Sequence, residues 1–246
     1  MHLLLTNDDG YDAPGLIALA EVARKFGRVT VLAPDTHQSG CSHGTTTDRP
    51  LEVKETGPGW FALGGTPADC SRVGLLHIAR DADWVLSGIN DGGNLGVDIY
   101  MSGTVAAARE AMLLGVPAMA ISQYRKGCPA DWARSARDIE AVLSQLLLHP
   151  PGRGTLWNVN LPDHDLPIPP EAIECDLDPH PLPLTLDVVA GKYVYHSNYQ
   201  QRRREPGADV DLCFGGHIAI TRVGHYAPLP VGGNEGRATD GEGVDR

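Results

Sequence analysis

Residues 2–33 read HLLLTNDDGYDAPGLIALAEVARKFGRVTVLA, and this stretch decides the fold. Residues 2–6 are a short apolar run that stops at Asn-Asp-Asp-Gly, which is typical of a buried strand ending in a loop. From residue 16 to residue 23, apolar side chains recur at helical spacing, and we expect Gly27 to cap the helix. Residues 28–33 predict a second strand, so the stretch is a strand–helix–strand unit of the usual right-handed kind.

The same alternation continues along the chain. Thr66 and Pro67 have the form of a helix start, with Thr as the N-cap and Pro in the first helical position. We expect further strands at residues 84–87, 118–122 and 156–160, two short strands between residues 51 and 63, and helices at residues 66–79, 102–114 and 131–148. Strands that alternate with helices indicate an α/β fold with a mostly parallel, doubly wound sheet.

The chain changes character after Leu161. Seven prolines lie between Pro162 and Pro183, and they rule out a regular helix there. Late strands are expected at residues 192–195 and 217–221. We therefore predict a core over residues 1–160, a proline-rich excursion with late strands over residues 161–230 that belongs to the same domain, and a disordered tail over residues 231–246.

Composition excludes several classes of protein. The chain has 246 residues, 42% of them hydrophobic, and a formal net charge of -11. Such a negative charge argues against binding of duplex nucleic acid, because contact with the phosphate backbone requires a basic surface. No apolar run approaches the roughly 20 residues that span a bilayer. We expect a soluble protein without a membrane anchor.

Cysteine usage indicates the compartment. The five cysteines are odd in number, widely scattered, and include no C-x-x-C pair. This pattern fits reduced thiols better than a disulfide framework or a structural zinc site. The first residues run directly from a short apolar segment into two acids, which is unlike a signal peptide. The expected location is therefore the cytoplasm.

Polar residues follow three of the predicted strands. Asp8 and Asp9 follow the first strand, Ser39 lies in the loop after the second, and Asn90 follows the strand at residues 84–87. In an open parallel sheet, such loops meet at the carboxyl ends of the strands. Two adjacent carboxylates are costly to hold together unless a cation neutralises them, and oxygen donors favour Mg²⁺ or Mn²⁺. The pattern predicts one divalent cation per subunit.

A second group of residues predicts a site for phosphate. Ser102, Gly103 and Thr104 stand at the expected start of a helix, where free backbone N–H groups bind anions. Asn94 adds a neutral amide donor. Glycines at 92, 93, 96 and 103 would let the backbone approach a substrate closely. An acidic protein could in this way hold a phosphate locally, as a metal-dependent phosphate-ester hydrolase requires.

Five ordered blocks resemble the signature of the SurE (survival protein E) family of 5'-nucleotidases. They are LLLTNDDGYDAPGL from Leu3, APDxxQSGxSH from Ala33, GGTPADC from Gly64, SGINxGxNLG from Ser87 and YMSGTVAAA from Tyr100. The resemblance covers the first half of the chain strongly and the remainder weakly. It implies a Rossmann-like core and a C-terminal part that is exchanged between subunits, which gives homodimers or homotetramers.

The resemblance also implies the chemistry. It places metal ligands at Asp8, Asp9, Ser39 and Asn90, and substrate contacts near Asn94, Ser102, Gly103 and Thr104. It implies hydrolysis of nucleoside 5'-monophosphates, with Asp8 and Asp9 in the catalytic role. Three routes stay open: attack by a metal-activated water, assistance by Asp8 or Asp9 as a general base, and direct attack through an aspartyl phosphate.

Several residues also have a simpler interpretation. Asp8-Asp9-Gly10 alone is compatible with an ordinary turn, and a loop histidine such as His43 is more often structural than an acid–base group.

The sequence departs from the family pattern in two places. Asp91 adds a negative charge where the family often has a basic or neutral residue. The late segment GHIAITR lacks the proline that commonly follows its Thr.

Other classes of function are disfavoured or remain as alternatives. A dinucleotide-dependent oxidoreductase is disfavoured, because the first strand–helix turn lacks G-x-G-x-x-G. A P-loop NTPase is excluded for want of its motif. A non-catalytic nucleotide or metal sensor could use all the same residues, and turnover alone distinguishes it from the enzyme.

Overall fold

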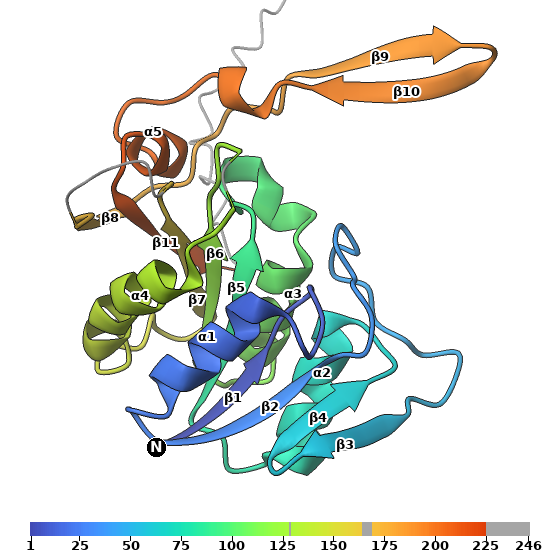
Figure 1. Cartoon of the computed structure of the whole chain (residues 1–246), viewed down its shortest axis with the longest axis vertical. Coiled ribbons are helices and arrows are strands. Elements are labelled where there is room, and N and C mark those ends of the chain that lie inside the picture. Colours follow the sequence, from blue (N-terminus) through green and yellow to red (C-terminus); the bar gives the residue numbers. More distant parts are fainter. Residues whose placement is uncertain (128, 164–168, 225–246) are drawn as a thin grey trace, which may run out of the picture.

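A mixed sheet runs through the whole molecule (Figure 1). The computed structural model describes residues 1–127, 129–163 and 169–224. Within these residues, nine strands form one sheet in the order β3-β4-β2-β1-β5-β6-β7-β11-β8. Their bounds are β1 His2–Thr6, β2 Arg28–Pro34, β3 Val53–Gly57, β4 Trp60–Leu63, β5 Trp84–Asp91, β6 Ala118–Gln123, β7 Thr155–Leu161, β8 Ala172–Cys175 and β11 Ile218–Gly224.

The central strands are parallel, as the alternating sequence predicts. β1 lies between β2 and β5, and it pairs in parallel with both. The chain leaves β1 toward β2 on one side and later returns to β5 on the other, so the strand order switches direction at β1 and β5. Ligands of open α/β sheets bind outside the carboxyl ends of the strands at such a switch.

Helices cover both faces of the sheet. On one face α1 (Pro14–Ala23) packs against α4 (Trp132–Leu146), and on the other α2 (Pro67–Val73) packs against α3 (Gly103–Leu113). Each face has its own buried apolar cluster, because side chains of a strand alternate between the two sides. In β1, for example, Leu3 and Leu5 belong to one cluster and Leu4 to the other.

The C-terminal part extends this sheet and also leaves it. β11 pairs antiparallel with β7, and β8 pairs in parallel with β11. A short helix, α5 (Asp209–Phe214), packs beside β11. Strands β9 (Leu184–Val189) and β10 (Lys192–Ser197) form a separate hairpin that projects from the body (Figure 1). We did not predict β8, β9 or α5, and the expected tail at residues 231–246 lies outside the described residues.

Most expected elements are present, with two informative differences. Gly27 does not cap α1, which ends at Ala23. A Cβ at Gly27 would lie 2.2 Å from the Met1 carbonyl oxygen, so this glycine permits a close backbone contact instead. The expected helix at residues 66–79 comprises α2 followed by a π-helical turn at Gly74–Ile78, and the predicted capping by Thr66 is confirmed. None of the helices in the described ranges is long and apolar enough to span a membrane.

Candidate active site

Asp8 is buried between β1 and the start of α3. The Thr104 hydroxyl donates a hydrogen bond to Asp8 Oδ1, and Asp8 is only 4% exposed. A Cβ at Gly103 would lie 2.9 Å from both Asp8 Oδ2 and the Cys41 sulfur, so only glycine permits this approach. Burial, and to a lesser extent the charge of Asp9, raises the pKa of Asp8 to about 6, although the Thr104 hydrogen bond opposes the shift.

Asp9 faces the loop after β5. Its Oδ2 accepts a hydrogen bond of 3.2 Å from the Asp91 backbone N–H, and its Oδ1 lies 3.5 Å from His37 Nδ1. Burial raises the pKa of Asp9 as well. The negative charge of Asp91, which departs from the family pattern, forms an ion pair with Arg125 after β6. This arginine compensates a charge that the sequence left without an evident partner.

The other two predicted metal ligands lie on the neighbouring loops. Ser39 is exposed in the loop after β2, and the Gln38 backbone N–H just before it donates to the Asp8 carbonyl oxygen at 2.8 Å. Asn90 lies at the end of β5 beside Asp91, and its Nδ2 donates to the Gly92 carbonyl oxygen at 2.8 Å. Asn90 Oδ1, the atom that could bind a cation, makes no hydrogen bond within the described ranges. The fold thus carries all four predicted ligands on three neighbouring segments, the loops after β1 and β2 and the end of β5.

The predicted helix start at Ser102 and Gly103 is present as the start of α3. Ser102 is the N-cap, and its side chain accepts a hydrogen bond of 3.0 Å from the Val105 N–H. The N–H groups of Gly103 and Thr104 precede the first bond of the α-helical pattern, which runs from Ala106 to Ser102. The first N–H groups of a helix have no partner inside it and point along the positive end of its dipole. They lie next to Asp8, because Thr104 itself contacts that carboxylate.

Asn94 is fixed in place by hydrogen bonds to neighbouring residues. Its backbone N–H donates to Asn160 Oδ1 at 2.7 Å, its carbonyl oxygen accepts from both Asn158 and Asn160, and its Nδ2 donates to Ser122 at 2.8 Å. One amide hydrogen of Asn94 is left over for a ligand. The sequence analysis missed Asn158 and Asn160. The available signal was their spacing of two residues in the strand sequence NVNL, which places both side chains on one face of the sheet.

His43 anchors its loop to α3. Its Nε2 lies 2.8 Å from Glu110 Oε2, and the other oxygen of this buried carboxylate accepts from Arg72 Nε at 2.5 Å. Ser42 donates from its hydroxyl to the Tyr100 carbonyl oxygen at 2.7 Å. These contacts join the loop of Ser39 to the segment that begins α3, which is a structural use of His43.

One neighbouring glycine has a use that differs from the expected one. A Cβ at Gly96 would lie 2.8 Å from the Asp178 carbonyl oxygen, so this glycine admits the C-terminal segment rather than a substrate. The Gly96 N–H donates to the buried Asp209 at 2.7 Å. Cys41 borders the site, but burial raises the pKa of its thiol, which disfavours the nucleophilic thiolate.

The donor set fits a hard divalent cation. No group of three or more His, Cys, Asp or Glu side chains arranged to hold a metal occurs in the part of the chain that the structure describes. Asp8 and Asp9 are adjacent carboxylates whose pKa values are both raised, and a bound cation would remove that penalty. With the Asn90 and Ser39 oxygens they offer only oxygen donors, which suit Mg²⁺ or Mn²⁺.

Proteins of known name are similar to this chain in sequence. The family model described as Survival protein SurE matches residues 3–175. A protein from Nostoc sp., provisionally named a 5'-nucleotidase, is 47% identical over 226 residues, which are 91% of this chain and 99% of that protein. The 5'-nucleotidase SurE of Geobacter sulfurreducens is 46% identical over 164 residues, which are 66% of this chain and 63% of that protein.

A solved structure of a SurE protein is similar to this chain in fold. The crystal structure of the SurE protein from Aquifex aeolicus superposes with a TM-score of 0.81 at 31% identity, covering 91% of this chain and 93% of that one. The likeness therefore extends beyond the core, into the C-terminal strands. The family model covers the loops that carry Asp8, Asp9, Ser39 and Asn90 together with the start of α3, and this chain belongs to the SurE family.

Proposed function

We propose that the protein is a metal-dependent 5'-nucleotidase, which hydrolyses nucleoside 5'-monophosphates to a nucleoside and phosphate. The buried contact between Asp8 and Thr104 carries the proposal, because it sets the Asp8 carboxylate beside the N–H groups that begin α3. A phosphoryl group can therefore meet oxygen ligands for a cation and anion-binding amides at one place. The names of the Geobacter and other SurE relatives support the same activity.

Each part of the site has a role in this reaction. Asp8, Asp9, Ser39 and Asn90 would hold the cation, which when bound neutralises phosphoryl charge and lowers the pKa of a bound water. The Gly103 and Thr104 amides would bind phosphoryl oxygens, with Asn94 as a further donor. Thr104 keeps Asp8 in one orientation through its hydroxyl. Preorganised donors of this kind contribute most where charge develops during the reaction.

Asp8 and Asp9 are the catalytic carboxylates of the proposal, and the chemical route is open to direct test. Rapid quench with labelled substrate would trap a phosphorylated aspartate if Asp8 or Asp9 attacks phosphorus directly. Its absence during turnover would favour attack by water.

The decisive experiment measures release of inorganic phosphate from a panel of nucleoside 5'- and 3'-monophosphates. Purified protein is assayed with Mg²⁺, with Mn²⁺ and with EDTA. We expect release with a divalent cation, its loss in EDTA, and a preference for 5'-monophosphates. Folded protein that releases no phosphate with either metal would contradict the proposal and favour a non-catalytic sensor.

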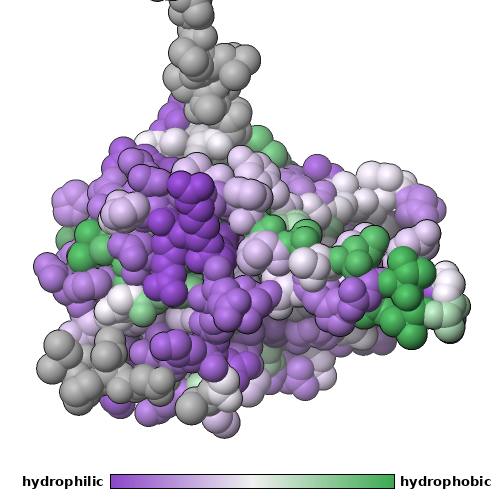
Figure 2. Space-filling view, turned by 90° about the horizontal axis from the view of Figure 1, so that it is seen from above, coloured by the Kyte–Doolittle hydropathy of each residue, from purple (hydrophilic) through white to green (hydrophobic). Residues whose placement is uncertain are grey.

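We further propose that residues 161–230 serve assembly of a homodimer or homotetramer, while residues 1–160 form the catalytic core. The β9–β10 hairpin supports this, since its large apolar side chains are exposed, among them Leu184, Val188 and Tyr195. In Figure 2 hydrophobic side chains gather at the right-hand end of the molecule, where the hairpin projects. Extended apolar patches of this kind mark protein interaction sites.

We also propose a cytoplasmic location. The four cysteines in the described ranges are free, as is usual in a reducing compartment. Fractionation of cells that express the tagged protein, with markers for each compartment, tests this location.

A further inference from the structure

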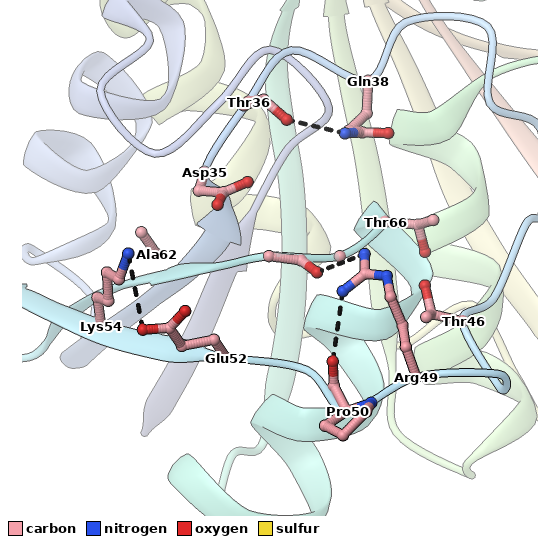
Figure 3. Close-up of a pocket in the computed structure, with 12 residues that line it drawn as sticks. Asp35, Thr36, Gln38, Thr46, Arg49, Pro50, Glu52, Lys54, Ala62 and Thr66 are labelled. Atoms are coloured by element: carbon pink, nitrogen blue, oxygen red, sulfur yellow. Dashed lines mark hydrogen bonds and ion pairs between the residues drawn. The ribbon is translucent and has the colours of Figure 1, made fainter.

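A polar pocket of about 410 Å³ opens beside the site described above. Its volume falls in the range of about 300–1,000 Å³ that is typical for small-molecule pockets. The loop after β2 supplies one part of its wall and the segment after β4 another (Figure 3). Its lining includes Asp35, Gln38, Arg49, Lys54, Gly64 and Thr66.

The pocket lies at a suitable distance from the predicted phosphate site. β4 is separated from β1 only by β2, and neighbouring strands are about 4.8 Å apart, so their ends lie about 10 Å from one another. Pro34 at the end of β2 pairs with Leu63 at the end of β4, so the segments that follow these two strands leave the sheet side by side. Gln38 connects the two places, since it lines the pocket and its N–H donates to the Asp8 carbonyl oxygen. A ligand whose phosphate sits beside Asp8 can therefore reach into the pocket.

Asp35 presents an acceptor without a protein partner. It follows β2 directly, and its backbone N–H donates to the Leu63 carbonyl oxygen, which fixes the position of the residue. Its carboxylate makes no hydrogen bond or ion pair with any residue in the described ranges. In dinucleotide-binding Rossmann folds, an acidic residue that follows the second strand accepts a hydrogen bond from a ribose hydroxyl. Asp35 occupies that place in this sheet.

The remaining lining is polar and partly fixed. Arg49 donates to the carbonyl oxygens of Pro50 and Gly64, at 3.3 and 2.9 Å, and Lys54 lies 3.7 Å from Glu52 (Figure 3). The pocket thus offers donors and acceptors to a polar ligand. Such a lining suits the edges of a nucleobase better than an apolar group.

The block GGTPADC, which supplies no metal ligand, builds one wall. Gly64, Gly65 and Thr66 line the pocket. Asp69 of the same block accepts hydrogen bonds from the backbone N–H groups of Thr66 and Thr46, which belong to the segment after β4 and to the loop after β2. The block therefore holds the pocket in shape.

We propose that this pocket binds the nucleoside part of the 5'-nucleotide, with Asp35 accepting hydrogen bonds from the ribose hydroxyls. The inference rests on the proposed 5'-nucleotidase function and names the place where specificity for a nucleotide arises. It assigns no chemical step to Asp35, which is a binding residue for the part of the substrate that does not react.

The test compares substrates with and without a ribose. Wild type, Asp35→Ala and the control Asp48→Ala are assayed on the best nucleoside 5'-monophosphate, on its 2',3'-dideoxy analogue and on p-nitrophenyl phosphate. Asp48 is exposed in the same loop and does not line the pocket. Loss of hydrogen bonds to a charged acceptor should lower the ratio of kcat/KM for the nucleotide to kcat/KM for p-nitrophenyl phosphate about 10- to 100-fold in Asp35→Ala. The control should keep the wild-type ratio.

The dideoxy analogue makes the assignment specific. Wild type should favour the ribonucleotide over this analogue by a similar factor, and Asp35→Ala should hardly distinguish the two. An unchanged ratio in Asp35→Ala, or an undiminished preference for the ribonucleotide, would overturn the inference while the 5'-nucleotidase function stands. If wild type hydrolyses none of the substrates, the proposed function fails instead. Calorimetric titration with adenosine and guanosine then decides on the pocket alone, since weaker binding by Asp35→Ala supports it and equal binding overturns it.

Discussion

At the carboxyl end of β1 a carboxylate is buried, whereas the β9–β10 hairpin carries apolar side chains into solvent. Asp8 is 4% exposed and Tyr195 is 76% exposed. Burial of a carboxylate is costly unless a positive charge or hydrogen bonds compensate it, and exposure of an apolar patch is costly unless another surface covers it. We therefore expect a second component to complete each region, a cation in the first and another copy of the chain in the second.

The largest effect is expected from removal of one charge in the buried region. Asp8→Asn keeps the shape of the side chain and an acceptor for Thr104 but loses a ligand charge. Loss of a catalytic group of this kind should lower kcat by about 10³-fold or more, measured as metal-dependent phosphate release. Asp12→Asn, an exposed acid four residues further along, is the matched control and should retain wild-type activity. An Asp8→Asn enzyme with more than a tenth of wild-type activity would refute the role of Asp8.

The same substitution should stabilise the metal-free protein at neutral pH. Burial, and then the charge of Asp9, raises the pKa of Asp8 to about 6 from an ordinary value of 3.8. In the folded state Asp8 therefore keeps its proton at pH values where the unfolded chain has released it. The free energy of unfolding falls as the pH rises between about 4 and 6. Asp8→Asn should escape this loss, which amounts to about 3 kcal/mol at most.

Thermal unfolding in EDTA from pH 4 to pH 8 measures this difference. The melting temperature of the variant should rise relative to wild type as the pH increases through that window. Added Mg²⁺ or Mn²⁺ should stabilise wild type and leave Asp8→Asn nearly unchanged. A constant difference between the two proteins across the pH range would show that Asp8 is not buried as a costly charge.

A smaller effect is expected where the buried region is anchored to its loops. Glu110 is nearly fully buried and holds both His43 and Arg72. Glu110→Gln removes the charge that pairs with Arg72, and it should cost about 2 kcal/mol, less than a fully buried pair because Arg72 is partly exposed. Glu140→Gln breaks only an exposed pair with Lys25 and should cost less than about 0.5 kcal/mol. Chemical denaturation of both variants gives the two values, and equal values would contradict the anchoring role.

The smallest effect on stability is expected in the hairpin, where assembly should change instead. Leu186 and Tyr195 are directly opposite in the β9–β10 register. The pair Leu186→Glu and Tyr195→Lys replaces two exposed apolar side chains by opposite charges that can still pair across the hairpin. Light scattering should report a smaller assembly, while the core of the subunit changes by less than about 0.5 kcal/mol. Leu148→Glu, at an exposed site near the end of α4, is the control and should leave the mass unchanged.

Much of the core could be predicted from local pattern. The strand at residues 2–6, the helix start at Thr66 and the helix ended by Gly115 are set by neighbouring residues, and the structure contains all three. The C-terminal part was harder to predict. β8 is four residues long and β9 is exposed on every residue, so neither carries the alternation of a half-buried strand. β8 pairs with the distant strand β11, whereas β9 pairs locally with β10 but buries no face that would show as alternation.

In the candidate site, too, some residues could be predicted from local pattern and others could not. Asp8, Asp9, Ser39 and Asn90 could be chosen because oxygen donors follow predicted strands, and their role as metal ligands remains a prediction. The partners that hold the residues next to these ligands could not be chosen. Arg125 meets Asp91, and Glu110 meets His43, across 34 and 67 residues of sequence, and no local pattern encodes such contacts.

The sequence by itself determined the alternation of strands and helices, the oxygen donors at the strand ends and the membership of the SurE family, because each depends on residue type and spacing along the chain. Only the tertiary structure decided that Thr104 meets Asp8, that Asn160 fixes Asn94, and that a pocket opens between the loops after β2 and β4. The reason is physical. Strand order and register bring together residues that are far apart in the chain, and those distances set the burial, hydrogen bonding and charge on which the site depends.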